Sequence, residues 1–126
     1  MATRGPATVL VAVDEPAMVH NVGRILRKRG LSVWEAFTPG EAIRLAESRL
    51  DPIDLLIADF DMPEVDRSEL CRVLRARDPG LRCLFLSESM PNRHGRHEQP
   101  AAKARFIQMP FGLVLLASVV DELLSR

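Results

Sequence analysis

Residues 53–63, IDLLIADFDMP, decide how the rest of the chain is interpreted. The first half of this segment is short and almost wholly apolar, which is typical of a strand buried inside a parallel sheet. Asp59 stands where this strand is expected to end and a loop to begin. In open α/β sheets that position faces the crevice where ligands bind. The segment therefore predicts a carboxylate with a chemical role at Asp59.

Apolar stretches of the same kind recur on both sides of this segment and alternate with helical patterns. Further strands are expected near residues 8–13, 31–36, 81–86 and 105–108, and helices near 16–29, 38–50, 68–77 and 110–124. Such alternation with short connections predicts a parallel sheet with helices on both faces. Five strands in a chain of this length favour a flavodoxin-like, doubly wound α/β fold with strand order 2-1-3-4-5.

The second predicted helix carries its own start signal. Thr38 is expected to be the N-cap, with Glu41 completing a capping box. The apolar stripe of this helix is expected to comprise Ala42, Leu45, Ala46 and Leu50. Trp34 precedes this helix on a strand expected at the edge of the sheet, so its side chain is expected to be half exposed.

Residues 89–100 interrupt the alternation. This segment should hold the fourth helix, but it contains two prolines, one glycine and almost no apolar residue. A helix needs an apolar stripe that it can bury. We therefore expect an irregular fourth helix or a loop, mobile relative to the rest of the chain. Residues 1–126 are expected to form a single domain in which residues 1–7 are a disordered tail.

Composition limits the classes of function that fit. Among the 126 residues, 17 basic residues balance 17 acidic ones. A nucleic-acid-binding domain is normally basic, so no nucleic-acid partner is expected. No apolar stretch approaches the roughly 20 residues of a membrane span, and the first residues lack the apolar region of a signal peptide. The sequence therefore predicts a cytoplasmic protein that makes no membrane contact.

Polar side chains stand where three of the predicted strands end. Asp14, Asp59 and Ser87 should lie close together, because the carboxyl ends of parallel strands share one edge of the sheet. Two facing carboxylates repel unless they are protonated or bridged by a cation, and oxygen ligands suit Mg²⁺. A metal at this edge would neutralise an incoming phosphate and leave Asp59 as the nucleophile, with Ser87 donating to a phosphoryl oxygen.

These residues and their spacing resemble the receiver domains of response regulators in two-component signalling. The matching stretches are residues 9–16, 30–33, 36, 40–42, 54–63, 66, 84–87 and 106–111. The likeness covers nearly the whole chain and implies the same flavodoxin-like fold. It implies a phosphorelay module that takes phosphate from a histidine kinase or a phosphotransfer protein. Such a module is not an enzyme with a separate substrate.

The resemblance also implies a role for each matching residue. Asp59 would be the phosphoacceptor, and Asp14, Asp59 and the backbone carbonyl of Asp61 would hold Mg²⁺. Ser87 would turn toward the phosphoryl group, and Phe106 would then swing inward. A partner surface near the last strand and helices would change, and a homodimer is expected through this face.

Two positions depart from the family pattern. Val13 stands where the first member of an acidic pair is usual, and Met109 replaces a lysine. The charge-assisted hydrogen bond of that lysine would be worth about 1.5–3 kcal/mol. Glu88 adds a negative charge near the site. The resemblance thus predicts a degenerate site with weakened phosphotransfer and weak Mg²⁺ binding. The alternative is a pseudo-receiver that binds partner proteins without being phosphorylated.

Plainer interpretations of the same residues stay open. Asp59 fits a solvated acid at a strand end, Met109 fits a side chain that fills an irregular gap, and Phe106 fits a static core aromatic. A flavodoxin-like enzyme or cofactor binder is the least favoured function. No glycine-rich phosphate loop follows the first predicted strand, where residues 14–16 read Asp-Glu-Pro.

Overall fold

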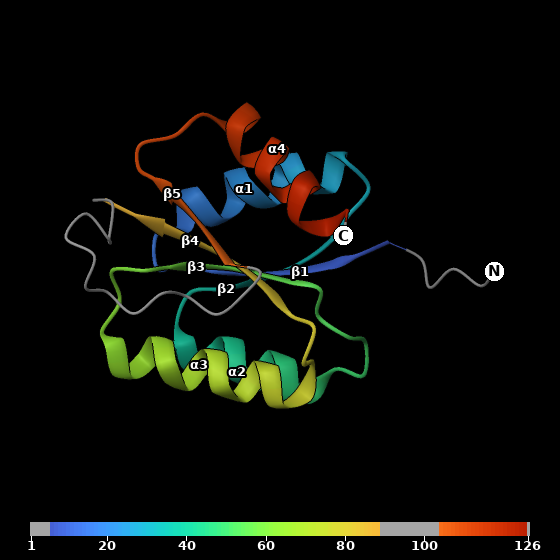
Figure 1. Ribbon diagram of the computed structural model, residues 1–126, viewed down its shortest axis with the longest axis vertical. Helices are drawn as coiled ribbons and strands as arrows, with labels where there is room; N and C mark the ends of the chain where they lie inside the picture. Colours follow the sequence, from blue (N-terminus) through green and yellow to red (C-terminus); the bar gives the residue numbers. More distant parts are fainter. Residues whose placement is uncertain (1–5, 89–103, 126) are drawn as a thin grey trace.

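The computed structural model describes residues 6–88 and 104–125 and arranges them in three layers (Figure 1). The strands are β1 (Thr8–Ala12), β2 (Ser32–Ala36), β3 (Leu55–Asp59), β4 (Arg82–Ser87) and β5 (Ala104–Gln108). The helices are α1 (Pro16–Lys28), α2 (Pro39–Ser48), α3 (Glu64–Arg77) and α4 (Leu113–Leu124). All strand pairs are parallel and the order is β2-β1-β3-β4-β5, which confirms the predicted fold class.

Two predicted segments fall wholly or mostly outside the described residues. These are the irregular fourth helix expected over 89–100 and all but the last two residues of the tail expected over 1–7. The carbonyl of Ala7 already accepts a hydrogen bond from the N–H of Ser32 at 2.9 Å. Within residues 6–88 and 104–125, no helix is both long and apolar enough to cross a bilayer.

The residues of each strand alternate between the two faces of the sheet. In β1, Val9 and Val11 pack into the core beneath α1 and α4, whereas Leu10 and Ala12 pack beneath α2 and α3. Figure 1 shows these two helix pairs on opposite sides of the sheet. All four side chains are at most 4% exposed. Burial on both faces explains why the strands are continuous apolar runs and fixes the strand ends relative to one another.

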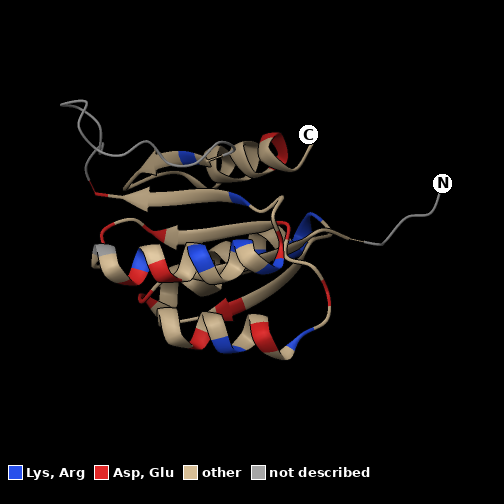
Figure 2. Cartoon of the chain, turned by 60° about the horizontal axis from the view of Figure 1, so that its bottom comes forward, with Lys and Arg blue, Asp and Glu red and all other residues tan. Residues whose placement is uncertain are grey.

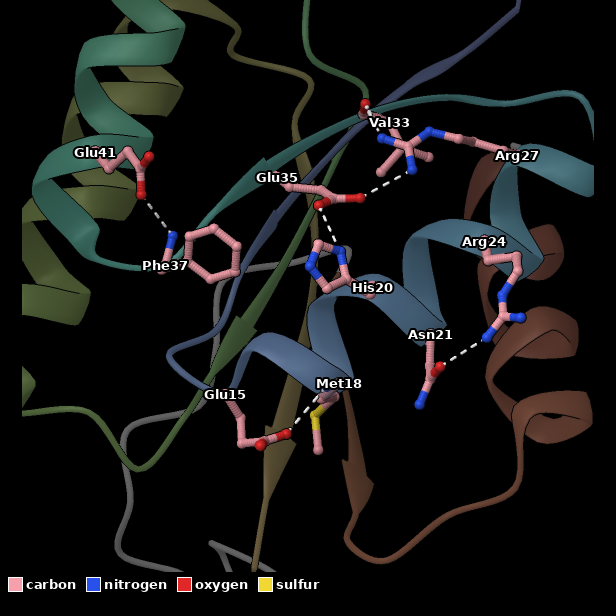
Figure 3. Close-up of polar contacts among 10 residues, drawn as sticks. All are labelled: Glu15, Met18, His20, Asn21, Arg24, Arg27, Val33, Glu35, Phe37 and Glu41. Atoms are coloured by element: carbon pink, nitrogen blue, oxygen red, sulfur yellow. Dashed lines mark hydrogen bonds and ion pairs between the residues drawn. The ribbon is translucent and has the colours of Figure 1, made fainter.

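The N-terminus of α2 is capped by side chains. Thr38 Oγ1 accepts the N–H of Glu41 at 3.0 Å, which confirms the predicted N-cap. The Glu41 carboxylate accepts the N–H of Phe37 at 2.8 Å (Figure 3). The reciprocal arm of the capping box therefore reaches the residue before the cap, one position further than predicted. Thr38 also lies beside the functional edge of the sheet described below.

Polar contacts fix α1 against the edge strand β2 (Figure 3). Glu35 Oε2 accepts from Arg27 Nη1 at 2.8 Å, and Glu35 Oε1 lies 3.2 Å from His20 Nδ1. Arg27 Nη2 donates to the carbonyl of Val33 at 3.0 Å. Because the Glu35 side chain is only 17% exposed, Arg27 and His20 replace much of the water that would otherwise contact its carboxylate. The contacts hold α1, and with it the turn that carries Asp14.

Three helix boundaries differ from the sequence prediction: α2 ends earlier, α3 begins earlier, and α4 begins at Leu113 and not near residue 110. α2 ends at Ser48, so Leu50 lies beyond the helix and is 99% exposed, and its predicted place in the apolar stripe is wrong. α3 begins at Glu64 and not near residue 68. The reason for the earlier start is that the N–H groups of Asp66 and Arg67 already bond to the carbonyl of Pro63.

The prediction that Trp34 is half exposed is also wrong. Its side chain is 7% exposed and packs into the core beneath α2 and α3. The guanidinium of Arg49 lies 4.5 Å from the centroid of the Trp34 ring. β2 lies at the edge of the sheet, so one side of its backbone has no neighbouring strand. The face of β2 that carries Trp34 is nevertheless covered by α2 and α3.

We expect Thr38→Ala to lower the free energy of unfolding by about 1 kcal/mol, the usual cost of losing an N-cap hydrogen bond. Urea denaturation measures the change. Thr38→Ser is the matched control, because it keeps the hydroxyl that accepts from Glu41 and should lose much less. Equal losses in the two variants would contradict a capping role.

Candidate functional site

The carboxyl ends of β1, β3 and β4 meet at one edge of the sheet. Asp14 follows β1 by two residues, Asp59 is the last residue of β3 and Ser87 is the last residue of β4. Figure 2 shows acidic residues gathered on the edge toward which the strand arrows point. Asp14 is exposed, Asp59 is half-buried and Ser87 is 1% exposed.

A hollow of about 320 Å³ opens at this edge, beside the start of α2. Four acidic residues line it: Asp14, Asp59, Asp61 and Asp66. The structure therefore brings Asp14 and Asp59 to the same hollow, although 45 positions separate them in the sequence. Thr38, Pro39 and Met62 form part of the remaining wall.

Asp61 links Asp59 to Ser87. The N–H of Asp61 donates to Asp59 Oδ1 at 3.0 Å. Its own carboxylate accepts twice, from Ser87 Oγ at 3.2 Å and from the N–H of Glu88 at 2.9 Å. The loop after β3 is thereby joined to the end of β4 by a bridging carboxylate.

The Asp59 carboxyl has a raised pKa. Burial is the largest cause, because it disfavours the charged form. The negative charges of Asp61, Asp14 and Glu88 raise the pKa further, while the hydrogen bond from the Asp61 N–H lowers it. The half-buried Asp59 carboxylate is thus surrounded by other negative charges. A proton on Asp59 or a bound cation would reduce the repulsion between them.

The donor set suits a hard cation that retains water. In the described part of the chain, no three His, Cys, Asp or Glu side chains form a group that could hold a metal ion. A cation here would rest on the carboxylates of Asp14 and Asp59, the carbonyl of Asp61 and bound water. Mg²⁺ is bound in proteins through one or two carboxylates and keeps several waters, so these residues fit it.

Val13 and Met109 contribute nothing polar to the acidic hollow. Val13 is 4% exposed and lies in the core beneath α1 and α4. Met109 is half-buried against the same core. With Met18 and Phe111 it lines a separate hollow of about 620 Å³ between α1 and the start of α4. Met109 therefore adds an apolar side chain to the layer beneath α1 and α4 and to the wall of this second hollow.

Phe106 is half-buried in a cluster of aromatic rings. Its ring centroid lies 4.8 Å from that of Phe60 and 5.5 Å from that of Phe85. Phe60 directly follows Asp59, and the Arg67 guanidinium lies 3.9 Å from the centroid of its ring. The residue after the predicted phosphoacceptor therefore contacts the predicted aromatic switch.

Sequence reasoning missed the part played by two side chains. It assigned only the backbone carbonyl of Asp61, whereas the carboxylate is the group that contacts Ser87 and the Glu88 N–H. Asp66 lines the hollow from the first turn of α3. The sequence signal for both residues was their spacing from Asp59: Asp61 lies in the loop after β3 and Asp66 in the first turn of α3.

The family model of the response regulator receiver domain matches residues 9–120. The chain therefore belongs to this family. Sensor kinase CckA of Brucella abortus (strain 2308) is 35% identical over 122 residues, which are 97% of this chain and 13% of the kinase. The response regulator receiver protein CpdR of the same strain is 28% identical over 117 residues, which are 92% of this chain and 95% of that protein.

Solved structures show the same fold. The receiver domain of the hybrid histidine kinase CckA is similar with a TM-score of 0.76 and 30% identity, covering 94% of this chain and 99% of that domain. TrrA of Thermotoga maritima, solved with Mg²⁺ and BeF, has a TM-score of 0.72 and 22% identity, covering 93% of this chain and 98% of that one.

Membership of the family defines the general role of the chain. Receiver domains are signalling modules of two-component systems, not enzymes that turn over a substrate. They interact with histidine kinases or phosphotransfer proteins and generally bind Mg²⁺ at the phosphorylation site. The chain spans 13%, 34% and 27% of the length of the first curated relatives it matches.

We expect Asp59→Asn to raise the melting temperature by a few degrees at neutral pH. The folded pKa of Asp59 lies above its unfolded value, so the ionised carboxylate is less favourable in the folded than in the unfolded chain. The gain should shrink as the pH falls through the raised pKa, because wild-type Asp59 then becomes protonated in the folded protein. Thermal unfolding of both proteins between about pH 4 and pH 8 measures this.

Glu47→Gln is the control for this experiment, because it removes an exposed acid near the far end of α2. That variant should show no comparable gain. A melting temperature of Asp59→Asn at or below wild type at neutral pH would contradict the raised pKa.

Proposed function

We propose that the chain is a phosphoaccepting receiver in which Asp59 takes a phosphoryl group with weakened chemistry. The observation that carries the proposal is the placement of Asp14 and Asp59 around one hollow, with Ser87 joined to Asp59 through Asp61. Those are the residue types that phosphoryl transfer to an aspartate requires. The proposed donor is a phosphohistidine on a histidine kinase or a phosphotransfer protein.

In the proposed reaction, one oxygen of the Asp59 carboxylate attacks the phosphorus of the phosphohistidine. The phosphorus–nitrogen bond breaks, its electron pair returns to the imidazole, and Asp59 becomes an acyl phosphate. Mg²⁺, when bound, neutralises charge between the carboxylates and the incoming group. Asp14 contributes a carboxylate on that side of the hollow, and Ser87 Oγ supplies a hydroxyl donor from β4.

Three features support weakened chemistry. The Met109 side chain packs against apolar residues and its thioether has no hydrogen to donate, so a charge-assisted contact worth about 1.5–3 kcal/mol is missing from this position. Val13 is buried and supplies no second carboxylate after β1. Glu88 adds a negative charge that is felt at Asp59. Together these features support a slow reaction and weak Mg²⁺ binding.

The apolar residues at two positions, the buried Val13 and the half-buried Met109, favour a second candidate function. In this alternative the chain is a pseudo-receiver that binds partner proteins independently of phosphorylation. The two functions differ in one variant: Asp59→Asn abolishes the output of a phosphoaccepting receiver and leaves the output of a pseudo-receiver intact.

We further propose a homodimer through the face formed by β5 and α4. Leu113, Val114 and Leu115 at the start of α4 are 38%, 83% and 51% exposed. Contiguous exposed apolar residues are typical of interaction surfaces. In sedimentation equilibrium, Val114→Asp should weaken self-association, and a wild-type protein that stays monomeric at every concentration would reject the dimer.

We expect wild-type protein with Mg²⁺ and acetyl phosphate to gain one phosphoryl group, slowly, and Asp59→Asn to gain none. Intact-protein mass spectrometry measures the product. An unmodified wild type, under conditions in which another receiver is modified, would favour the pseudo-receiver.

Within the same assay, Met109→Lys should speed modification about 10- to 100-fold, because it restores one charge-assisted donor. A lysine can keep its stem in the apolar layer while its ammonium reaches the edge. Met109→Leu is the control, since it keeps the packing without a charge and should react like wild type.

A further inference from the structure

The Asp61 carboxylate occupies two hydrogen-bond donors at the end of β4, the strand that pairs with β3 beside the proposed phosphoacceptor Asp59. Oδ1 accepts from Ser87 Oγ at 3.2 Å and Oδ2 accepts from the Glu88 N–H at 2.9 Å. The two donors are consecutive along the chain and converge on one carboxylate. They come from the end of β4, while Asp61 comes from the loop after β3.

A hydroxyl and an amide arranged in this way form an anion-binding pair. Each has one hydrogen to donate and so satisfies one acceptor well. An anionic acceptor makes such bonds shorter and stronger than a neutral one does. A carboxylate and a phosphoryl group both present neighbouring anionic oxygens, so either can fill the pair, but both cannot do so at once.

The position of Asp61 makes the competition local. Its N–H donates to Asp59 Oδ1 at 3.0 Å, so Asp61 lies directly against the proposed phosphoacceptor. Burial is the main cause of the raised pKa of Asp59, and the negative charge of the Asp61 carboxylate adds to it, so that charge also disfavours a second anion beside Asp59. A phosphoryl group on Asp59 would meet the carboxylate of Asp61 in the space between Asp59 and Ser87.

We propose that Asp61 is a built-in stand-in for the phosphoryl group, whose carboxylate holds Ser87 Oγ and the Glu88 N–H until a phosphoryl group on Asp59 displaces it. The Asp61 side chain thus limits access of a phosphoryl group to these two donors. This role is separate from the predicted role of the Asp61 backbone carbonyl in holding Mg²⁺. This inference rests on the proposed phosphoaccepting function, since it concerns the same hollow.

Beryllofluoride with Mg²⁺ tests the competition without a covalent step. Asp61→Asn and Asp61→Ala should each bind it about tenfold or more tightly than wild type, because neither presents an anion to the donor pair. Fluorine NMR counts the bound fluoride directly. Asp66→Asn is the matched control: it removes another carboxylate of the hollow without releasing Ser87 or Glu88.

A second measurement reads the contact itself. Amide hydrogen exchange of Glu88 should speed up about tenfold or more in Asp61→Ala, because the N–H loses its acceptor, and should stay unchanged in Asp66→Asn. Far-ultraviolet circular dichroism checks that each variant is folded. Asp61 is exposed, so its replacement leaves the core intact.

The outcomes separate this inference from the function on which it rests. Tighter binding in both Asp61 variants than in Asp66→Asn, with faster Glu88 exchange, supports the stand-in. If wild type binds beryllofluoride, and the Asp61 variants gain no more affinity than Asp66→Asn does, the stand-in role of Asp61 is overturned. The phosphoaccepting function is then unaffected. Unchanged Glu88 exchange in Asp61→Ala also overturns it. Absence of binding in every protein, Asp61 variants included, overturns both.

Discussion

Crowded negative charge at the carboxyl end of a rigid parallel sheet governs the chemistry of this domain. β1 and β3 are held in register by direct pairing and by cores on both faces, so Asp59 at the end of β3 and Asp14 just after β1 are held at the same edge of the sheet. Asp14, Asp59, Asp61 and Asp66 share one hollow, and burial with like charge raises the pKa of Asp59. Three kinds of group can offset the repulsion at the Asp59 carboxylate: a proton, a cation or an oriented N–H group. The structure supplies the third through the backbone of Asp61.

The fold and the central acid followed from the sequence because both depend on short-range patterns. An apolar run of strand length places Asp59 at a strand end, and the parallel topology then brings Asp14 to the same edge. The predictions were wrong where tertiary contacts determine the end of a helix or the burial of a side chain. Periodicity assigned Leu50 to α2, but the chain turns extended at Arg49, with φ −118° and ψ 148°. Trp34 was placed correctly on an edge strand, yet helix-layer packing and Arg49 cover it.

The side chain of Asp61 could not be assigned for a related reason. Loop residues have no periodicity from which the direction of a side chain follows, so a pattern can place Asp61 near Asp59 but cannot show which donors it reaches. Its contacts depend on the end of β4, which is 26 positions away in the sequence. Val13 and Met109 show the opposite case. Their apolar character was visible in the sequence, and the structure adds that Val13 belongs to the core beneath α1 and α4 and that Met109 packs against it.

Phe60 connects this acidic edge to the rest of the molecule. Its N–H donates to the carbonyl of Leu86 at 2.8 Å, and its carbonyl accepts from Arg67 at 2.9 Å. Its ring lies at 77° to that of Phe106 on the outermost strand. One residue next to the central acid is thus anchored to β4, α3 and β5 at once. Because Phe60 bonds to β4 and α3 and packs against β5, the backbone beside Asp59 is tied through a single aromatic residue to three elements besides its own strand.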